Sequence, residues 1–166
     1  SAACEEPCAP ALADSVACAL ARAVEAAPEQ RRPKSAFDSS SVPGVSVECY
    51  VQRLQMSFQC SDGTYVCALA ILDRFLLRCG ATGREPQRLT AWNVHRLFLA
   101  SLVVSAKYND DVVLTNRQYA KVGGMQVSEL NLMERVLLGT LDFDVRVSLE
   151  QHGRYEATLR RLAAAA

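Results

Sequence analysis

One stretch near the middle of the chain, residues 89–108, has apolar side chains on every side of the helix that it predicts. Its sequence is LTAWNVHRLFLASLVVSAKY. The apolar residues around its circumference are Leu97, Phe98, Leu99, Leu102, Val103 and Val104. A helix without a polar face belongs inside a protein, because any exposed side would leave apolar surface in water. We therefore predict that this segment is the central helix of a packed core.

The rest of the chain also repeats its apolar residues at about 3.6 positions, the period of an α-helix, and no strand-type alternation interrupts the pattern. The predicted helices lie at residues 10–27, 46–58, 63–79, 89–108, 116–122, 128–141 and from 148 onward. Four residues can cap helix starts, namely Ser46, Asp62, Ser128 and Ser148. Three glycines can end helices, namely Gly80, Gly123 and Gly124. The predicted fold class is all-α, with five core helices around the buried third one and flanking N- and C-terminal helices.

A polar stretch, EQRRPKS, separates the first predicted helix from the others. Its proline and charges suit an exposed hinge. We therefore divide the chain into an N-terminal helix and linker (1–35), a compact domain (36–147) and a C-terminal helix (148–166). We expect the segment up to about Lys34 to be dispensable for the fold, because chain termini outside a core tolerate removal.

Charge and cysteine content restrict the classes of partner and compartment. Eighteen basic residues balance eighteen acidic ones, so no net field draws the chain to nucleic acid or to an anionic membrane. No stretch reaches the roughly 18 apolar residues of a membrane span, and the alanine-rich start lacks the pattern of a signal peptide. The seven cysteines include no C-x-x-C spacing, which favours reduced thiols in the cytoplasm or nucleus.

Asp73 interrupts an apolar helical stripe, four residues after Leu69 and three before Leu76. Burying a carboxylate is costly unless the charge is paired. We predict a structural ion pair with Arg53, at the edge of the apolar face of the first core helix. Arg74 is the alternative partner, on the solvent side.

Two further charged residues lie beside apolar positions. Lys107 falls in the last turn of the central helix, where a cation stabilises the negative end of the helix dipole by about 0.3–1 kcal/mol. Glu134 lies between Leu130 and Leu138 at four-residue spacing, where a carboxylate can simply be a solvated flank. Each has this ordinary explanation by itself, but the two together suggest a site.

Several segments occur in an order that resembles one known family. They are FDSSSVPGVSVECYVQRL, ILDRFL, NVHRLFLASLVVSAKYNDD, TNRQYAKVGG and SELNLMERVLL. Their sequence and spacing resemble the cyclin box, and in particular the phosphate-pathway cyclins of fungi and the related P- and U-type cyclins of protists. The resemblance covers about residues 36–147. It implies a single five-helix cyclin box that regulates a cyclin-dependent protein kinase in division or phosphate signalling, needs no cofactor and is a monomer when free of the kinase.

The resemblance also implies roles for individual residues. In cyclins a lysine at the end of the third box helix and a glutamate in the fifth grip the backbone beside the kinase C-helix, and Lys107 and Glu134 match these positions. The ammonium suits carbonyl oxygens, and the carboxylate suits N–H groups. Apolar kinase contacts would come from Tyr108, Leu138, Phe143 and Val145. Ordinary core packing is the alternative for each of these four. The family also pairs an arginine of helix one with an aspartate of helix two, as Arg53 and Asp73 would.

One family feature is missing from this chain. Mitotic and S-phase cyclins carry an M-R-A-I-L-x-x-W run in helix one that forms a substrate-docking groove. The corresponding YVQRLQMSFQ contains Gln52, Gln55 and Gln59 and no tryptophan. We therefore expect substrate choice to use another surface.

Other functional classes have little support in the sequence. His95 and His152 are the only histidines, and no nucleophile motif surrounds them, so we assign no catalytic residue. Cys4 and Cys8 lack a second pair of ligands, so we expect no metal site. The remaining alternative is a cyclin-fold adaptor or transcription-associated scaffold that binds no kinase. A basic surface and a second repeat would favour that class, and neither is visible in the sequence.

Overall fold

The computed structural model describes residues 11–27, 35–81 and 88–165, and these residues form seven helices without a strand. The helices are α1 (Leu12–Glu25), α2 (Val47–Ser57), α3 (Asp62–Ala81), α4 (Val94–Asn109), α5 (Asn116–Gly123), α6 (Val127–Thr140) and α7 (Leu149–Ala164). The predicted all-α class is confirmed, with five box helices between two flanking ones.

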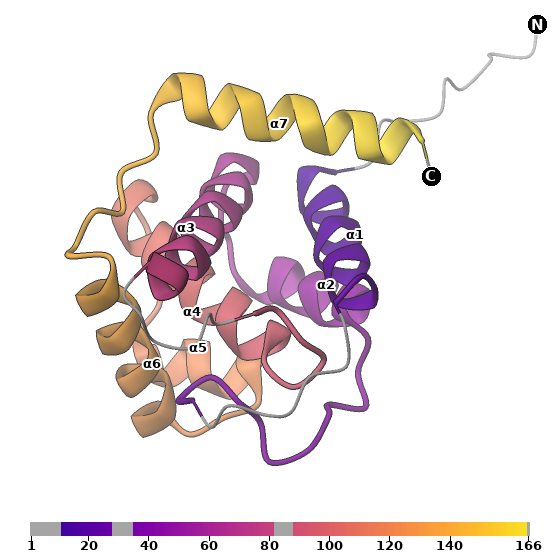
Figure 1. Cartoon of the computed structure of the whole chain (residues 1–166). Coiled ribbons are helices and arrows are strands. Elements are labelled where there is room, and N and C mark those ends of the chain that lie inside the picture. Colours follow the sequence, from indigo (N-terminus) through magenta and orange to yellow (C-terminus); the bar gives the residue numbers. More distant parts are fainter. Residues whose placement is uncertain (1–10, 28–34, 82–87, 166) are drawn as a thin grey trace, which may run out of the picture.

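Helix α4 is the centre of the fold, as its sequence predicted. Every residue from 97 to 106 is buried. Helices α2, α3, α5 and α6 pack against it (Figure 1). Burial of each large apolar side chain contributes about 1.5–3 kcal/mol. Its exposed residues are the C-terminal Lys107, Tyr108 and Asn109, and Arg96 in its first turn is partly exposed.

Two of the predicted N-terminal caps are confirmed. The side chain of Ser46 accepts a hydrogen bond from the backbone N–H of Cys49 at 3.2 Å, at the start of α2. Ser148 accepts from the N–H of Gln151 at 3.1 Å, and Gln151 accepts from the N–H of Ser148 at 3.0 Å. Each of these bonds satisfies an N–H group that the first helical turn leaves unpaired.

Three other helix starts differ from the prediction. Helix α4 begins at Val94, five residues after the predicted start at Leu89. Helix α6 begins at Val127, and its cap residue is Gln126 instead of Ser128. The N–H of Gln126 donates to the carboxylate of Glu129 at 2.9 Å, so the helix can start one turn before that carboxylate. Asp62 is the first residue of α3 and not the residue before it.

Two glycines end α5 for different reasons. Gly124 has a φ of 73°, in the left-handed region where a side chain is strained. A Cβ atom on Gly123 would lie 2.3 Å from Cδ2 of Leu99, in α4. Gly123 therefore allows α5 to approach the central helix closely.

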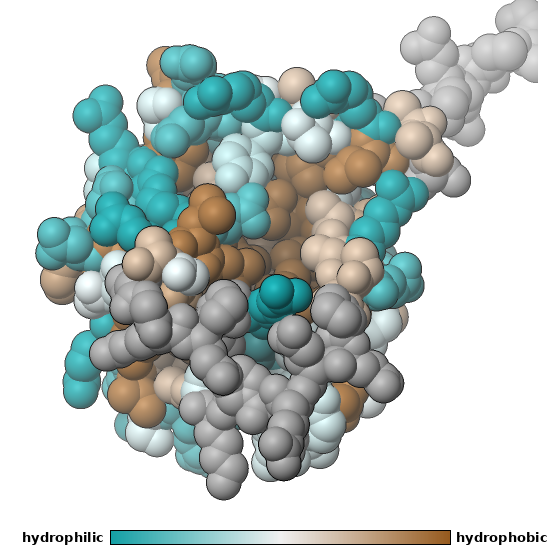
Figure 2. Space-filling view, in the orientation of Figure 1, coloured by the Kyte–Doolittle hydropathy of each residue, from teal (hydrophilic) through white to brown (hydrophobic). Residues whose placement is uncertain are grey.

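Helix α1 shares its core with the box helices. Its buried residues are Leu12, Ala13, Ser15, Val16, Ala17 and Leu20. It packs against α2, α3 and α7, and α7 crosses the ends of α1 and α3 in Figure 1. Figure 2 shows apolar side chains beneath α7, over the region between α1 and α3. These contacts weigh against the expectation that the N-terminal segment is dispensable.

Most of the predicted linker, at residues 28–34, lies outside the described residues. The predicted division of the chain at residues 35/36 and 147/148 therefore stays a prediction. Cys4 and Cys8 also lie outside the described residues. Of the described cysteines, Cys67 is buried and Cys49 is exposed, and neither is in a disulfide. Within the described ranges, no helix combines the length and apolar character that a membrane span requires.

Candidate partner-binding site

The structure brings together the two charged residues that the sequence singled out. Lys107 lies in the last turn of α4, and Glu134 lies in the middle of α6. The ammonium Nζ of Lys107 is 2.6 Å from Oε1 of Glu134. The side chains are 35% and 14% exposed, respectively. The pair is therefore accessible from one side and held by the helices on the other.

A third polar residue, Asn116, completes this cluster, and sequence reasoning missed it. Its Nδ2 donates to Oε2 of Glu134 at 2.8 Å and to the side chain of Asn131 at 2.7 Å. Asn116 begins α5 directly after the cap residue Thr115. That position indicates a helix start and carries no signal of a contact with α6.

The cluster retains unused hydrogen-bonding capacity. An ammonium group has three donors, and Lys107 directs one of them to Glu134. A carboxylate oxygen can accept more than one hydrogen bond, and each oxygen of Glu134 has one donor among the described residues. Both side chains can therefore still bind backbone groups of a partner.

The four predicted apolar contact residues differ in their exposure. Tyr108 is 54% exposed and Phe143 is 71% exposed, so both present apolar surface near the ends of α4 and α6. Leu138 is partly buried and packs against the core. Val145 is only 7% exposed. Core packing, the alternative interpretation, accounts for Val145.

The turn that carries Phe143 is held in an uncommon backbone conformation. Asp142 and Phe143 have φ angles of 52° and 59°, a left-handed conformation that persists in non-glycine residues only when surrounding contacts impose it. Arg74 of α3 supplies such contacts. Its Nη1 donates to the carbonyl of Asp144 at 2.6 Å, and its Nη2 donates to that of Arg146 at 3.0 Å. The chain that follows Phe143 is thus anchored to α3.

The predicted ion pair between Arg53 and Asp73 is wrong, and so is the alternative pair with Arg74. Asp73 accepts a hydrogen bond from the hydroxyl of Tyr155 in α7 at 2.9 Å. The guanidinium of Arg53 lies over the ring of Tyr50, 5.1 Å from its centroid. Arg53 is on the exposed side of α2, whereas α7 covers the part of α3 that carries Asp73.

Burial raises the pKa of Asp73, although the hydrogen bond from Tyr155 acts in the opposite direction. Sequence reasoning missed Tyr155. An aromatic residue with a polar tip in a flanking helix is a weak signal, and it does not identify a partner in another helix.

Five helices packed around a buried central one, with one further helix on each side, have the architecture of a cyclin box with flanking helices. The chain belongs to the cyclin family, since the family model described as Cyclin matches residues 4–145. The predicted P- or U-type character is also confirmed. Relatives that illustrate this are plant proteins, in addition to the fungal and protist cyclins that the sequence resembles.

Three relatives illustrate the similarity. Cyclin-U4-2 of Arabidopsis thaliana is 35% identical over 127 residues, which cover 76% of this chain and 56% of the relative. Cyclin-P3-1 of Oryza sativa subsp. japonica is 37% identical over 120 residues, covering 72% and 48%. Cyclin-U3-1 of Arabidopsis thaliana is 38% identical over 111 residues, covering 67% and 48%. The chain spans about half the length of the curated relatives that it matches.

Proposed function

We propose that this cyclin is the regulatory subunit of a cyclin-dependent protein kinase. It binds the kinase through a surface formed by Lys107, Tyr108, Glu134, Leu138 and Phe143, here called the kinase-binding face. The Lys107–Glu134 pair carries the proposal, because it is accessible to solvent and has unused donors and acceptors. The rings of Tyr108 and Phe143 are exposed as well. Val145 is not part of this face, because it is buried.

The polar groups of the kinase-binding face are suited to hydrogen bonds with backbone groups of the kinase. The free donors of Lys107 match carbonyl oxygens, and the carboxylate of Glu134 matches N–H groups. Every residue of a partner offers these groups whatever its side chain, so such contacts tolerate variation in the partner sequence. Tyr108 and Phe143 would add apolar contacts, and aromatic anchors of this kind often dominate binding energy.

The cyclin would act by binding one state of the kinase in preference to another. An active kinase needs its C-helix in place, so that a lysine–glutamate pair can order ATP. A partner that binds this state more tightly shifts the population toward it. Changing the ratio of active to inactive kinase from 1:99 to 99:1 needs a binding free energy that favours the active state by about 5.5 kcal/mol. The cyclin contributes no catalytic residue and no cofactor to this mechanism.

The pathway, the cellular compartment and the oligomeric state are proposed from the family resemblance alone. We propose a role in division or phosphate signalling, in the cytoplasm or nucleus, and a monomer before kinase binding. A cyclin-fold adaptor without a kinase is the competing function, and it predicts that no kinase is activated.

The test begins with the kinase that copurifies with the tagged chain from its native cell. Its affinity for purified variants is then measured by titration calorimetry, and its activity is measured with each variant. Phe143→Ala is the cleanest variant, since a side chain that is 71% exposed contributes little to stability. We expect a loss of at least about 2 kcal/mol, roughly 30-fold in affinity. Met56→Ala is the matched control, because Met56 is 89% exposed on α2, outside the face.

Lys107→Ala and Glu134→Ala should also lose at least about 2 kcal/mol of binding free energy. These two residues pair with each other, so each variant also removes an internal ion pair. A double-mutant cycle on the free energy of unfolding of the free chain measures the coupling between Lys107 and Glu134 inside the protein. The coupling from a second cycle, on the free energy of kinase binding, must be larger than this value. Lys121→Ala, at an exposed lysine of α5, is the control. Parent affinity in Lys107→Ala and Phe143→Ala would exclude the proposed face. Binding without activation would favour the adaptor.

A further inference from the structure

Four polar residues join the start of α3 to the C-terminal end of α4. Oδ1 of Asp110, the residue that follows α4, accepts a hydrogen bond from the hydroxyl of Ser61 at 3.1 Å. It accepts another from the hydroxyl of Thr64 at 2.8 Å. Earlier in α4, the hydroxyl of Ser105 donates to the backbone carbonyl of Thr64 at 2.8 Å. We call these four residues the α3–α4 joint.

The α3–α4 joint holds the backbone on both sides of two residues of the kinase-binding face. Lys107 and Tyr108 lie between Ser105 and Asp110 in the sequence, and Thr64 bonds to both of these flanking residues. Thr64 is 1% exposed and Ser105 is fully buried. The short segment that carries Lys107 and Tyr108 is therefore attached to α3 at two points.

The last turn of α4 needs such an attachment more than the rest of the helix does. Helix ends open more readily than helix centres, because their final carbonyl groups have no partner within the helix. In α4 the last turn is also the exposed part, since Lys107, Tyr108 and Asn109 are exposed whereas residues 97 to 106 are buried. The packing of the core therefore holds the body of α4 more firmly than its end.

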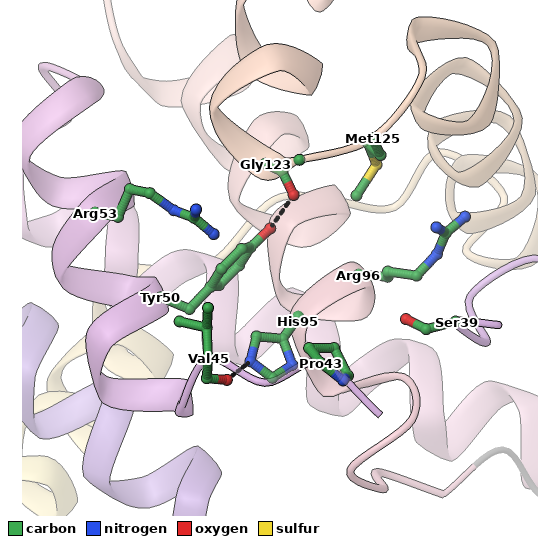
Figure 3. A pocket seen from close by; sticks show the side chains of 10 residues that line it. Ser39, Pro43, Val45, Tyr50, Arg53, His95, Arg96, Gly123 and Met125 are labelled. Atoms are coloured by element: carbon green, nitrogen blue, oxygen red, sulfur yellow. Dashed lines mark hydrogen bonds between the residues drawn. The ribbon is translucent and has the colours of Figure 1, made fainter. Parts of the chain in front are cut away.

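A separate set of contacts fixes the opposite end of α4. Nε2 of His95 donates to the carbonyl oxygen of Val45 at 2.8 Å, and Arg96 pairs with Glu129 of α6 across 3.0 Å. Figure 3 shows His95 and Arg96 at this end, around a pocket of about 170 Å³ that is far along the helix from Lys107. Loss of the α3–α4 joint should therefore loosen the last turn and leave the rest of α4 in place.

We propose that Thr64 and Asp110 are positioning residues that hold Lys107 and Tyr108 in the arrangement that binds the kinase. Side chains that are ordered before binding lose less conformational entropy when the partner arrives, so the affinity is higher. The start of α3, which is not part of the kinase-binding face, thereby controls how tightly that face binds. This inference rests on the proposed function, because the joint acts through kinase binding.

The first test uses the free chain and needs no kinase. Thr64→Val removes the hydroxyl but keeps the branched shape of a buried side chain, and Asp110→Ala removes the acceptor. We expect both variants to speed the amide hydrogen exchange of Tyr108 and Asn109 about tenfold, because these amides exchange when the last turn opens locally. Thr64→Ser retains the hydroxyl and should exchange like the parent.

The ion pair of the kinase-binding face gives a second measurement on the free chain. A double-mutant cycle reports the coupling between Lys107 and Glu134 in the parent, and the same cycle is repeated in the Thr64→Val background. We expect the coupling to fall by roughly half, since the pair requires an ordered last turn. A hydroxyl that only contributed to overall stability would leave this coupling unchanged.

Kinase affinity is then compared between variants that lose the same kind of hydrogen bond. Thr64→Val and Asp110→Ala should weaken binding of the copurifying kinase about tenfold, and Thr64→Ser should bind like the parent. Tyr155→Phe is the matched control, because it also removes a hydroxyl that donates to an aspartate, but between α7 and α3. It should keep the parent affinity. Thermal melts verify that each variant is folded at the temperature of the assay.

Three results would overturn the inference. The first is unchanged amide exchange and unchanged coupling in the free variants, whatever the kinase does. The second is parent affinity in Thr64→Val and Asp110→Ala while Lys107→Ala binds weakly. The third is an equal loss of affinity in Tyr155→Phe, which would assign the effect to stability. Faster exchange in the free variants, together with parent affinity in Lys107→Ala and Phe143→Ala, would instead exclude the kinase-binding face itself, and with it the role of the joint in binding.

Discussion

The hydroxyl of Tyr155 donates a hydrogen bond to Oδ2 of Asp73 across 2.9 Å and thereby joins α7 to α3. No cation pairs with this carboxylate in the described part of the chain. Burial raises the pKa of Asp73, and the bond from Tyr155 partly opposes that effect. The stability of this contact therefore depends on one neutral donor in place of an ion pair.

Removal of the Tyr155 hydroxyl should destabilise the protein. Tyr155→Phe leaves the carboxylate of Asp73 without its partner, which typically costs about 1–3 kcal/mol. Arg53→Ala should change stability by less than about 0.5 kcal/mol, because Arg53 is exposed and does not reach Asp73. Urea unfolding measures both. A loss from Arg53→Ala as large as that from Tyr155→Phe would restore the predicted ion pair.

Stability should depend on pH through Asp73. Its folded-state pKa is raised, so the fold favours the protonated form. The contribution of this group is fully present below its unfolded-state pKa and is lost as pH rises through its folded-state pKa. The free energy of unfolding should therefore fall relative to that of Asp73→Asn as pH increases through this window. Denaturant titrations of both proteins at a series of pH values test this, and parallel curves would contradict it.

Substitution of a buried residue in α1 should destabilise the whole domain. Leu20 is 1% exposed and belongs to the same core as the box helices. We expect Leu20→Ala to cost about 2–5 kcal/mol, as truncation of a buried leucine usually does. Ala23→Gly, at an exposed position of α1, is a control that should cost no more than about 1 kcal/mol.

Deletion of the chain up to residue 34 then tests the earlier expectation of dispensability directly. A deleted protein that unfolds cooperatively at the parent temperature would show that α1 is an appendage after all. Loss of the cooperative transition would place α1 within the domain and move its boundary toward the N-terminus.

Gly123→Ala should destabilise the contact between α5 and α4. Its Cβ would lie 2.3 Å from Leu99, a side chain that is fully buried, and such overpacking costs about 1–3 kcal/mol. Gly139→Ala is the matched control, since nothing lies within 4 Å of its added Cβ. That control should gain about 0.5–1 kcal/mol from helix propensity. Thermal melts compare the two, and equal effects would remove the packing explanation for Gly123.

Local sequence patterns were sufficient to predict where the helices lie and to which family the chain belongs. The apolar period predicted each helix, because it depends on residues three and four positions apart on one segment. Ser46 and Ser148 marked helix starts because a cap bonds within one turn. The all-apolar circumference of α4 likewise required a central position, whatever the identity of its neighbours.

Tertiary structure alone decided which side chains meet. The partner of Asp73 is Tyr155, 82 residues away, although Arg53 matched the family pattern. Val145 and Phe143 are two positions apart, yet one is buried and the other exposed. A helical period specifies which face of a segment is apolar, but the neighbour of that face depends on how the helices cross. The ends of α4 illustrate this, since Lys107 meets α6 and His95 meets the segment before α2 only after the helices have packed.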